Sequence, residues 1–290
     1  MVIPRLYRFV SVTGAVRMGI SHQELAVGDT IECIDAQHLS AWMRGENPHG
    51  ASMLKTASTR RQDQIVKMLP PIPFAPPAIF GIGLNFHGHA TEVELPIPNQ
   101  PVVFMKNPAS LCGPEDPIVV PSFAQEPPEC DYEVELAVVL GRDAKDVPIS
   151  DALEYVLGYT VANDVSARRW QGPKRSGGQW CRSKSFDTFT PLGPALTLSA
   201  GVDPTALTLH TELNGKTMQN STTADMIFDV AHLIHFLSQG TTLQAGSIIL
   251  TGTPEGVGYT RKPPVWLRDG DTITVSIDSV GQLTNRVVYA

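Results

Sequence analysis

Three acidic residues have the types and spacing that best suit chemistry in this chain of 290 residues. Glu133 and Glu135 lie two positions apart in the apolar segment DYEVELAVVL. Side chains alternate between the faces of a strand, so both carboxylates point to one side, which continues with alanine and valine. Asp164 directly follows a second apolar run, YTVAN. These carboxylates could converge on Mg²⁺ or Mn²⁺, which prefer oxygen ligands, or the two glutamates could face solvent.

A second group of titratable side chains lies in the segment GIGLNFHGHATEVELP. His89 and Glu92 are three positions apart, which places both on one face of a helical turn. There the carboxylate can fix the tautomer of the imidazole, and the other ring nitrogen can take a proton from water. A zinc site built on His87 and His89 is the weaker hypothesis, because no third nitrogen or sulfur ligand is near in the sequence. A polar loop with incidental histidines is the alternative.

The segment RRWQGPKRSGGQWCRSK is locally basic in an acidic protein. A net charge of −7 argues against nucleic acid or an anionic membrane as the main partner, and no apolar run reaches transmembrane length. Guanidinium and ammonium groups instead suit a small anionic substrate. Lys174 and Arg175, beside two glycines, are typical of a solvated loop.

The elements that must position these residues follow a boundary marked by the proline-rich stretch LPPIPFAPPAIF. Proline fixes φ and removes a donor, so residues 71–78 are expected to form a stiff linker. It separates a small β-rich N-terminal domain, residues 1–70, from a catalytic domain, residues 79–290. Many strands with few helices predict an α+β protein, mostly β, built round a rolled sheet or a barrel.

Turn residues predict three hairpins. Alternation around Thr13-Gly14 indicates the first, and Asn214-Gly215, the pair that best tolerates positive φ, indicates the second. The segment DTITVSIDSVGQLTNRVV is expected to close the fold as a third.

Two helices are predicted. Residues 224–239 carry an apolar stripe, with Thr222 or Thr223 as the cap and Gly240 just past the end. The segment SDALEYVL is expected to be a short helix that begins at Ser150 and ends before Gly158.

The four cysteines are far apart and form no CxxC or zinc spacing, which is typical of free thiols in a reducing compartment. We therefore expect a cytoplasmic protein. The N-terminal stretch holds two arginines and no acid, as a mitochondrial presequence would, so a mitochondrial location is the alternative. The hairpin interpretation of that stretch is favoured.

Four motifs give the chain a wider resemblance. YEVELAVVLGR, ANDVSAR, SKSFDTFTPLGP and LTGTPEGVG, in this order and spacing, resemble the fumarylacetoacetate hydrolase superfamily. The small unit before the proline stretch is similar to its short branch, which includes acylpyruvate hydrolases and oxaloacetate decarboxylases. The resemblance implies the family's mixed β-roll with a small N-terminal domain, and a homodimer.

The same resemblance assigns roles to individual residues. It implies that Mg²⁺ or Mn²⁺ is held by Glu133, Glu135 and Asp164. It implies that a lid brings His89 and Glu92 to the site as a dyad, and that Lys184 stabilises an enolate. The residues implied to contact the substrate are Lys106, Arg168, Gln171 and Thr253, the last with nearby backbone N–H groups. No acidic residue stands near Leu84 and Asn85, where full-length fumarylacetoacetases have a further ligand.

The implied activity is metal-dependent hydrolysis of the C3–C4 bond of a small acylpyruvate-type 2,4-dioxo acid through a metal-bound enolate. The same enolate would form in the decarboxylation of oxaloacetate, or in the isomerisation or hydration of a dienol acid, and these remain alternatives. A non-catalytic binding protein is less favoured, because the dyad and the lysine are both present.

Overall fold

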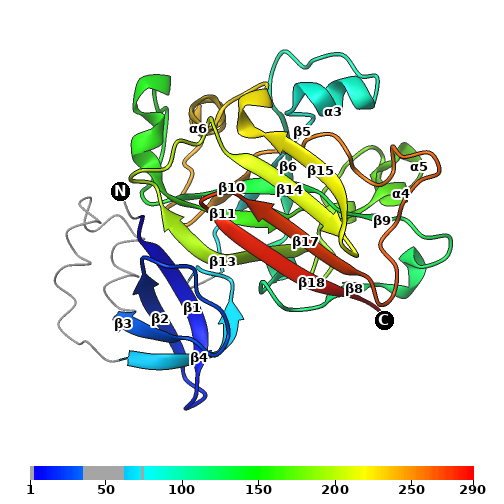
Figure 1. Cartoon of the computed structure of the whole chain (residues 1–290). Coiled ribbons are helices and arrows are strands. Elements are labelled where there is room, and N and C mark those ends of the chain that lie inside the picture. Colours follow the sequence, from blue (N-terminus) through cyan, green and yellow to red (C-terminus); the bar gives the residue numbers. More distant parts are fainter. Residues whose placement is uncertain (1–2, 35–61, 73–74) are drawn as a thin grey trace.

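The computed structural model describes residues 3–34, 62–72 and 75–290, and strands make up most of the regular structure there (Figure 1). None of the helices in these ranges is long and apolar enough to span a membrane. The predicted α+β, mostly β class is confirmed. The helical segments are α3 (His87–Glu92), α4 (Arg168–Gln171), α5 (Pro173–Ser176), α6 (Val230–Ser238), η1 (Pro108–Ser110), η2 (Ser122–Ala124), η3 (Ile149–Tyr155), η4 (Arg182–Lys184) and η5 (Thr223–Asp225).

The larger sheet runs from the N-terminal strands through the centre of the molecule, in the order β2-β3-β4-β1-β13-β11-β10-β16-β5-β6, with β7 beside β13. Most neighbours are antiparallel, but β16 pairs in parallel with β5, and β13 with β7. Its strands are β1 (Arg5–Ser11), β2 (Val16–Ser21), β3 (Thr30–Ile34), β4 (Gln62–Leu69), β5 (Ile79–Gly83), β6 (Val102–Lys106), β7 (Leu111–Cys112), β10 (Val134–Leu140), β11 (Val156–Asn163), β13 (Thr190–Leu198) and β16 (Ile248–Leu250).

A second, five-stranded sheet lies across the first and is formed mainly by the C-terminal strands (Figure 1). Its order is β15-β14-β17-β18-β8, and the short pair β12-β9 stands apart from it. The strands are β8 (Ile118–Val120), β14 (Thr208–Leu213), β15 (Lys216–Thr222), β17 (Thr272–Ile277) and β18 (Gly281–Tyr289), with β9 (Cys130–Asp131) and β12 (Ser166–Ala167) as the separate pair.

Strand β10 is buried along its whole length because both of its faces are covered. Val134, Leu136 and Val138 belong to the core that includes residues of the second sheet. Ala137 and Val139 belong to a separate core with residues of β13 and β16. The face that carries the glutamates is therefore interior, and the solvent-facing alternative for this strand is wrong.

All three predicted hairpins are confirmed. Strands β1 and β2 pair up to Val10 opposite Val16, and β17 and β18 pair up to Ile277 opposite Gly281. Between β14 and β15, Asn214 and Gly215 have φ values of 51° and 76°.

The predicted helix over residues 224–239 begins later than expected. Helix α6 starts after Asp229, whose side chain accepts a hydrogen bond from His232 N at 2.8 Å, and Thr222 caps only the short turn η5. The segment between them is bound by Asn85, which accepts the backbone N–H groups of Ile227 and Phe228 through its carbonyl and side-chain oxygens. Those N–H groups cannot serve a helix, so a tertiary contact overrides the local pattern.

The prediction for SDALEYVL is only partly correct. This segment is the 3₁₀ turn η3, which starts after Pro148 rather than at Ser150. Gly158 is not a helix end and lies inside strand β11. A Cβ atom at Gly158 would lie 2.4 Å from the carbonyl oxygen of Thr197 on β13, so glycine permits the close approach of two strands.

The N-terminal strands join the larger sheet through the pairing of β1 with β13, from Arg5 opposite Thr197 to Tyr7 opposite Ala195. The predicted linker, residues 71–78, contains residues 73–74, which lie outside the described ranges. The predicted domain limits therefore stay a prediction.

Asn85 should be important for stability, because it is fully buried and its side chain donates to the carbonyls of Phe228 and Thr251 at 3.0 and 2.7 Å. Asn85→Ala leaves those groups without this partner, and we expect the free energy of unfolding to fall by about 2–4 kcal/mol. Urea unfolding followed by tryptophan fluorescence measures it. Asn220→Ala, at an exposed position, is the control. Equal stability of the two variants would contradict this account.

Candidate active site

The three carboxylates predicted to act together meet in the interior. One oxygen each from Glu133, Glu135 and Asp164 lies within 4.8 Å of the others. Glu133 immediately precedes β10, Glu135 lies in it, and Asp164 follows the neighbouring strand β11. Glu133 is 4% exposed, Glu135 1% and Asp164 0%, so solvent does not screen their repulsion.

Two lysines neutralise part of this charge. Nζ of Lys184 lies 2.6 Å from Oε2 of Glu133 and 2.5 Å from Oδ2 of Asp164. The ammonium of Lys106 donates to the other oxygen of Asp164 and, at 2.9 Å, to the carbonyl of Phe189. Lys184 lines the cavity described below, whereas Lys106 lies outside its lining, beside Asp164.

Arg168, at the start of α4, completes the set of cations and depends on a residue that the sequence analysis missed. Its Nη2 lies 2.7 Å from Oε1 of Glu133, and its Nε donates to Asp131 at 2.8 Å. The guanidinium also stacks on the ring of Tyr259 at 4.3 Å and donates to Gln171 at 3.3 Å. Asp131 is fully buried. The sequence does contain a signal for Asp131, because this residue is two positions before Glu133 and so continues the alternation that relates Glu133 to Glu135.

Burial and neighbouring charges move the pKa values of these groups in different directions. Burial raises the pKa of Glu135 well above its usual range, and the charges of Asp164 and Glu133 raise it further. Burial also acts on Glu133, but the charges of Lys184 and Arg168 outweigh it and lower that pKa. The pKa of Lys184 is raised, because the two carboxylates outweigh the effect of burial. Lys184 therefore remains an ammonium at neutral pH.

The donor set fits a divalent cation. Among the described residues Glu135 forms no ion pair, and its one hydrogen bond comes from Gly252 N at 2.8 Å. A buried carboxylate without a direct ion pair, beside two further carboxylates, is a site that an added cation would stabilise. Three carboxylates supply the hard oxygen ligands that Mg²⁺ and Mn²⁺ prefer, with positions left for other ligands.

Helix α3 carries His89 and Glu92 on one face, as their spacing predicts. Nδ1 of His89 lies 3.2 Å from Oε2 of Glu92. The other oxygen of Glu92 accepts hydrogen bonds from Gly256 N at 3.0 Å and Thr260 Oγ1 at 2.9 Å. Burial alone would raise the pKa of Glu92, but the hydrogen bonds from His89, Gly256 and Thr260 lower it. Glu92 is therefore a carboxylate at neutral pH, and it holds the imidazole in one orientation.

The loop after β16 also binds carboxylates of the protein itself. Three of its N–H groups are not free for a substrate carboxylate, because glycines donate them to acidic side chains. These bonds run from Gly252 to Glu135, from Gly256 to Glu92 and from Gly258 to Asp131, with lengths of 2.8, 3.0 and 2.7 Å. The loop thus connects helix α3 to the carboxylate cluster, and its residues Thr253 and Tyr259 line the cavity.

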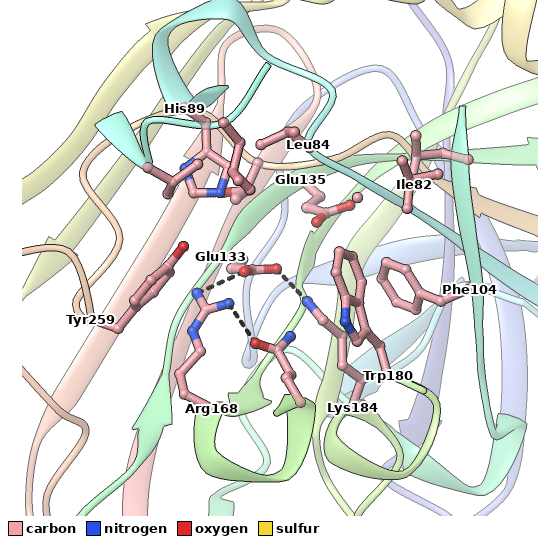
Figure 2. A pocket seen from close by; sticks show the side chains of 16 residues that line it. Ile82, Leu84, His89, Phe104, Glu133, Glu135, Arg168, Trp180, Lys184 and Tyr259 are labelled. Carbon is pink, nitrogen blue, oxygen red and sulfur yellow. Dashed lines mark hydrogen bonds and ion pairs between the residues drawn. The ribbon is translucent and has the colours of Figure 1, made fainter. Parts of the chain in front are cut away.

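A cavity of about 280 Å³ lies between α3 and the carboxylates (Figure 2). Its polar lining consists of His89, Glu133, Glu135, Arg168, Gln171, Lys184, Thr253 and Tyr259. Its apolar lining includes Ile82, Leu84, Val93, Leu95, Val102, Phe104 and Trp180. The cavity therefore brings together most of the predicted site residues, while Glu92, Lys106 and Asp164 support them from behind.

Two glycines on one face of β5 make room for the aromatic part of this apolar wall. Figure 2 shows Phe104 and Trp180 side by side, with ring centroids 5.7 Å apart. A Cβ atom at Gly81 would lie 2.2 Å from the ring of Phe104, and one at Gly83 would lie 2.2 Å from that of Trp180. Neither aromatic residue is among the site residues predicted from the sequence.

The amino-acid sequence matches a known protein family and several relatives. Residues 78–288 match the family model described as fumarylacetoacetate (FAA) hydrolase C-terminal. A fumarylacetoacetate hydrolase domain-containing protein 2 homolog from Dictyostelium discoideum is 47% identical over 225 residues, covering 74% of this chain and 72% of the relative. A mitochondrial oxaloacetate tautomerase from Xenopus laevis is 45% identical over 224 residues, covering 77% and 69%.

Solved structures agree with the sequence match. A fumarylacetoacetate hydrolase from Exiguobacterium antarcticum has a TM-score of 0.82 and 35% identity, and the match covers 99% of this chain and 100% of that one. A 5-carboxymethyl-2-hydroxymuconate delta-isomerase from Mycobacterium smegmatis has a TM-score of 0.78 and 36% identity, with the same coverage. The predicted fold is therefore confirmed, and the chain belongs to the fumarylacetoacetate hydrolase family of enzymes.

Proposed function

We propose that this enzyme interconverts the keto and enol forms of a small 2-oxo acid of the oxaloacetate type by moving a proton at C3. The observation that carries the proposal is the His89–Glu92 pair, which lies over the same cavity as Lys184 and the buried carboxylates. The name of the Xenopus laevis relative, an oxaloacetate tautomerase at 45% identity, supports this reaction class.

His89 is the base in this proposal. Because ionised Glu92 accepts the Nδ1–H, the lone pair of Nε2 is free to take the proton from C3. The electrons of the C–H bond then form the C2=C3 double bond, and negative charge moves to the 2-oxo oxygen. Protonation of that oxygen gives the enol, and the reverse sequence returns the keto form.

The cations of the site bind and stabilise the anionic substrate. The Lys184 ammonium lies at the cavity and donates to the oxygen on which charge develops. Arg168, Gln171 and Thr253 bind the carboxylates of the substrate. Lys106 contributes through Asp164, whose charge it neutralises, rather than by touching the substrate.

Mg²⁺ or Mn²⁺ is the proposed cofactor, with Glu133, Glu135 and Asp164 as its ligands. When bound, the cation would withdraw electron density from the carbonyl group as a Lewis acid. The residues present fit this role, because the three carboxylates supply oxygen donors and Glu135 forms no direct ion pair within the described part of the chain.

The apolar wall favours a second candidate, hydrolysis of the C3–C4 bond of an acylpyruvate. A four-carbon diacid would leave Leu84, Phe104 and Trp180 without apolar contact, whereas an acyl chain would cover them. His89 would then take a proton from water, the oxygen would attack the C4 carbonyl, and the C3–C4 bond would break. The products would be pyruvate and a carboxylic acid.

We also propose a cellular location and an oligomeric state for the enzyme. Relatives named as mitochondrial proteins favour the mitochondrial alternative over the cytoplasm. A homodimer is consistent with exposed Val103 and Met105 on the edge strand β6.

One assay separates the two candidate reactions. The Mg²⁺-loaded protein is incubated with oxaloacetate, acetylpyruvate and fumarylpyruvate. Enol absorbance of oxaloacetate is followed directly, and pyruvate is measured in all three. We expect the protein to accelerate the keto–enol exchange of oxaloacetate and to form no pyruvate from any of the three compounds. Pyruvate from the two acylpyruvates without faster exchange would instead establish hydrolysis, and pyruvate from oxaloacetate would establish decarboxylation.

His89→Ala should lower the catalysed rate roughly 10²- to 10⁴-fold, the usual contribution of a general base. The rate is measured as kcat for the substrate that the wild type converts. His232→Ala, an exposed histidine on α6, is the matched control and should keep full activity. An unchanged kcat in His89→Ala would rule out the base assignment.

Glu135→Gln should weaken cation binding. Loss of groups that only support a ligand costs 10- to 100-fold in metal affinity, so loss of a direct ligand should raise the Kd for Mn²⁺ or Mg²⁺ by at least roughly that factor. Isothermal titration calorimetry gives the Kd. Glu115→Gln, which removes an exposed carboxylate, is the control. Wild-type affinity in Glu135→Gln would refute the proposed ligand set.

A further inference from the structure

Gln219 on β15 forms an unusually complete set of hydrogen bonds behind the cavity. Its side chain is 1% exposed. Oε1 accepts from Val134 N at 3.1 Å and from Thr211 Oγ1 at 2.9 Å. Nε2 donates to Thr253 Oγ1 at 2.8 Å and to the carbonyl of Pro254 at 2.9 Å. Both donors and both acceptor positions of the amide are therefore used.

Two backbone groups fix the orientation of this amide. Val134 N–H can only donate, so it must face the oxygen of Gln219. The Pro254 carbonyl can only accept, so it must face the nitrogen. The bond between Gln219 and Thr253 consequently has one direction, with the amide as donor and the hydroxyl oxygen as acceptor.

This direction determines what the Thr253 hydroxyl can do. Its oxygen accepts a hydrogen bond from Gln219, so its own O–H must point elsewhere. Thr253 lines the cavity, and no described residue accepts a hydrogen bond from that O–H. The hydroxyl is therefore held as a donor for a ligand in the cavity.

The same amide connects Thr253 to the carboxylates. Val134 stands between Glu133 and Glu135, and its N–H lies beyond the part of β10 that pairs with β16, residues 137–139. Gln219 Oε1 takes the place of a strand partner there. The Gln219 side chain therefore holds the loop that carries Thr253 next to Val134, which stands between two of the carboxylates.

We propose that Gln219 is a positioning residue that presents the Thr253 hydroxyl as a hydrogen-bond donor to the carboxylate of the 2-oxo acid. The inference rests on the proposed function, because it requires a carboxylate substrate in the cavity. It goes further in assigning a role to a side chain that does not line the cavity.

A double-mutant cycle tests this role. The Kd of oxalate, a planar mimic of a 2-oxo carboxylate, is measured by calorimetry with the Mg²⁺-loaded protein. Thr253→Val removes the hydroxyl and should raise the Kd roughly ten- to hundredfold. Gln219→Glu turns the donor into an acceptor, so the hydroxyl must donate to it instead, and a similar loss is expected. In the Thr253→Val background, Gln219→Glu should change the Kd less than about twofold.

A second variant avoids a buried charge. Gln219→Met removes the hydrogen bonds with little change in size, and its effect should likewise vanish when Thr253 is valine. Gln282→Glu adds the same charge at an exposed position and should leave the Kd unchanged.

The outcomes separate the inference from the proposed function. If the increases in the oxalate Kd multiply in the double variants, Gln219 and Thr253 act independently, and the inference is overturned. If neither Gln219 variant folds, the role of Gln219 is structural, and the inference is overturned as well. A wild-type protein that binds no oxalate would overturn the proposed function together with it.

Discussion

The carboxylates of Asp131, Glu133, Glu135 and Asp164 are buried in one small region, and compensation of their charge constrains much of the surrounding structure. Burial of an ionised group costs several kcal/mol unless a partner offsets it. The partners come from separate elements, because Lys106 ends β6, Arg168 begins α4 and Lys184 ends η4. The fold must therefore bring these segments to the ends of β10 and β11. Among the described residues, no cation forms a direct ion pair with Glu135, which is why the same arrangement suits a metal.

The loop after β16 is the second point on which the site depends. Three of its N–H groups bind acids from three elements, and so it joins β10, β9 and helix α3. Gly252 and Gly256 have φ values of 93° and 97°, a region that favours glycine. A Cβ atom at Gly256 would also lie 2.2 Å from the carbonyl oxygen of Met218. The glycines of LTGTPEGVG therefore allow the backbone conformation of the turn, and they also allow its close contacts with neighbouring segments.

The cavity divides into a charged floor and an apolar wall, and this division is consistent with the range of reactions named among the relatives. In the proposed function, an enolate would form at the floor, and such an enolate is common to tautomerisation, decarboxylation and C–C hydrolysis. In the proposed function, the group that follows C3 would extend toward the wall, where Leu84 has a left-handed φ of 54°. Such a conformation costs a non-glycine residue energy and persists where the surroundings enforce it, here next to the hydrogen-bonded Asn85.

Local patterns in the sequence determined the local geometry. Alternation placed Glu133 and Glu135 on one side of a strand, a spacing of three placed His89 next to Glu92, and Asn-Gly specified a hairpin. Each follows from backbone geometry over a few residues, so no distant contact was needed. The resemblance of four motifs supplied the family and the expected partners of these residues.

Only the tertiary structure decided what surrounds those residues. It showed that the glutamates are buried, that Asp131 orients Arg168, that Lys106 lies behind Asp164, and that Asn85 delays the start of α6. Each depends on segments far apart in the chain, as in the bond from Gly252 to Glu135, 117 positions away. Burial and hydrogen-bond partners arise when such segments pack together, and a local pattern contains no information on which segments meet.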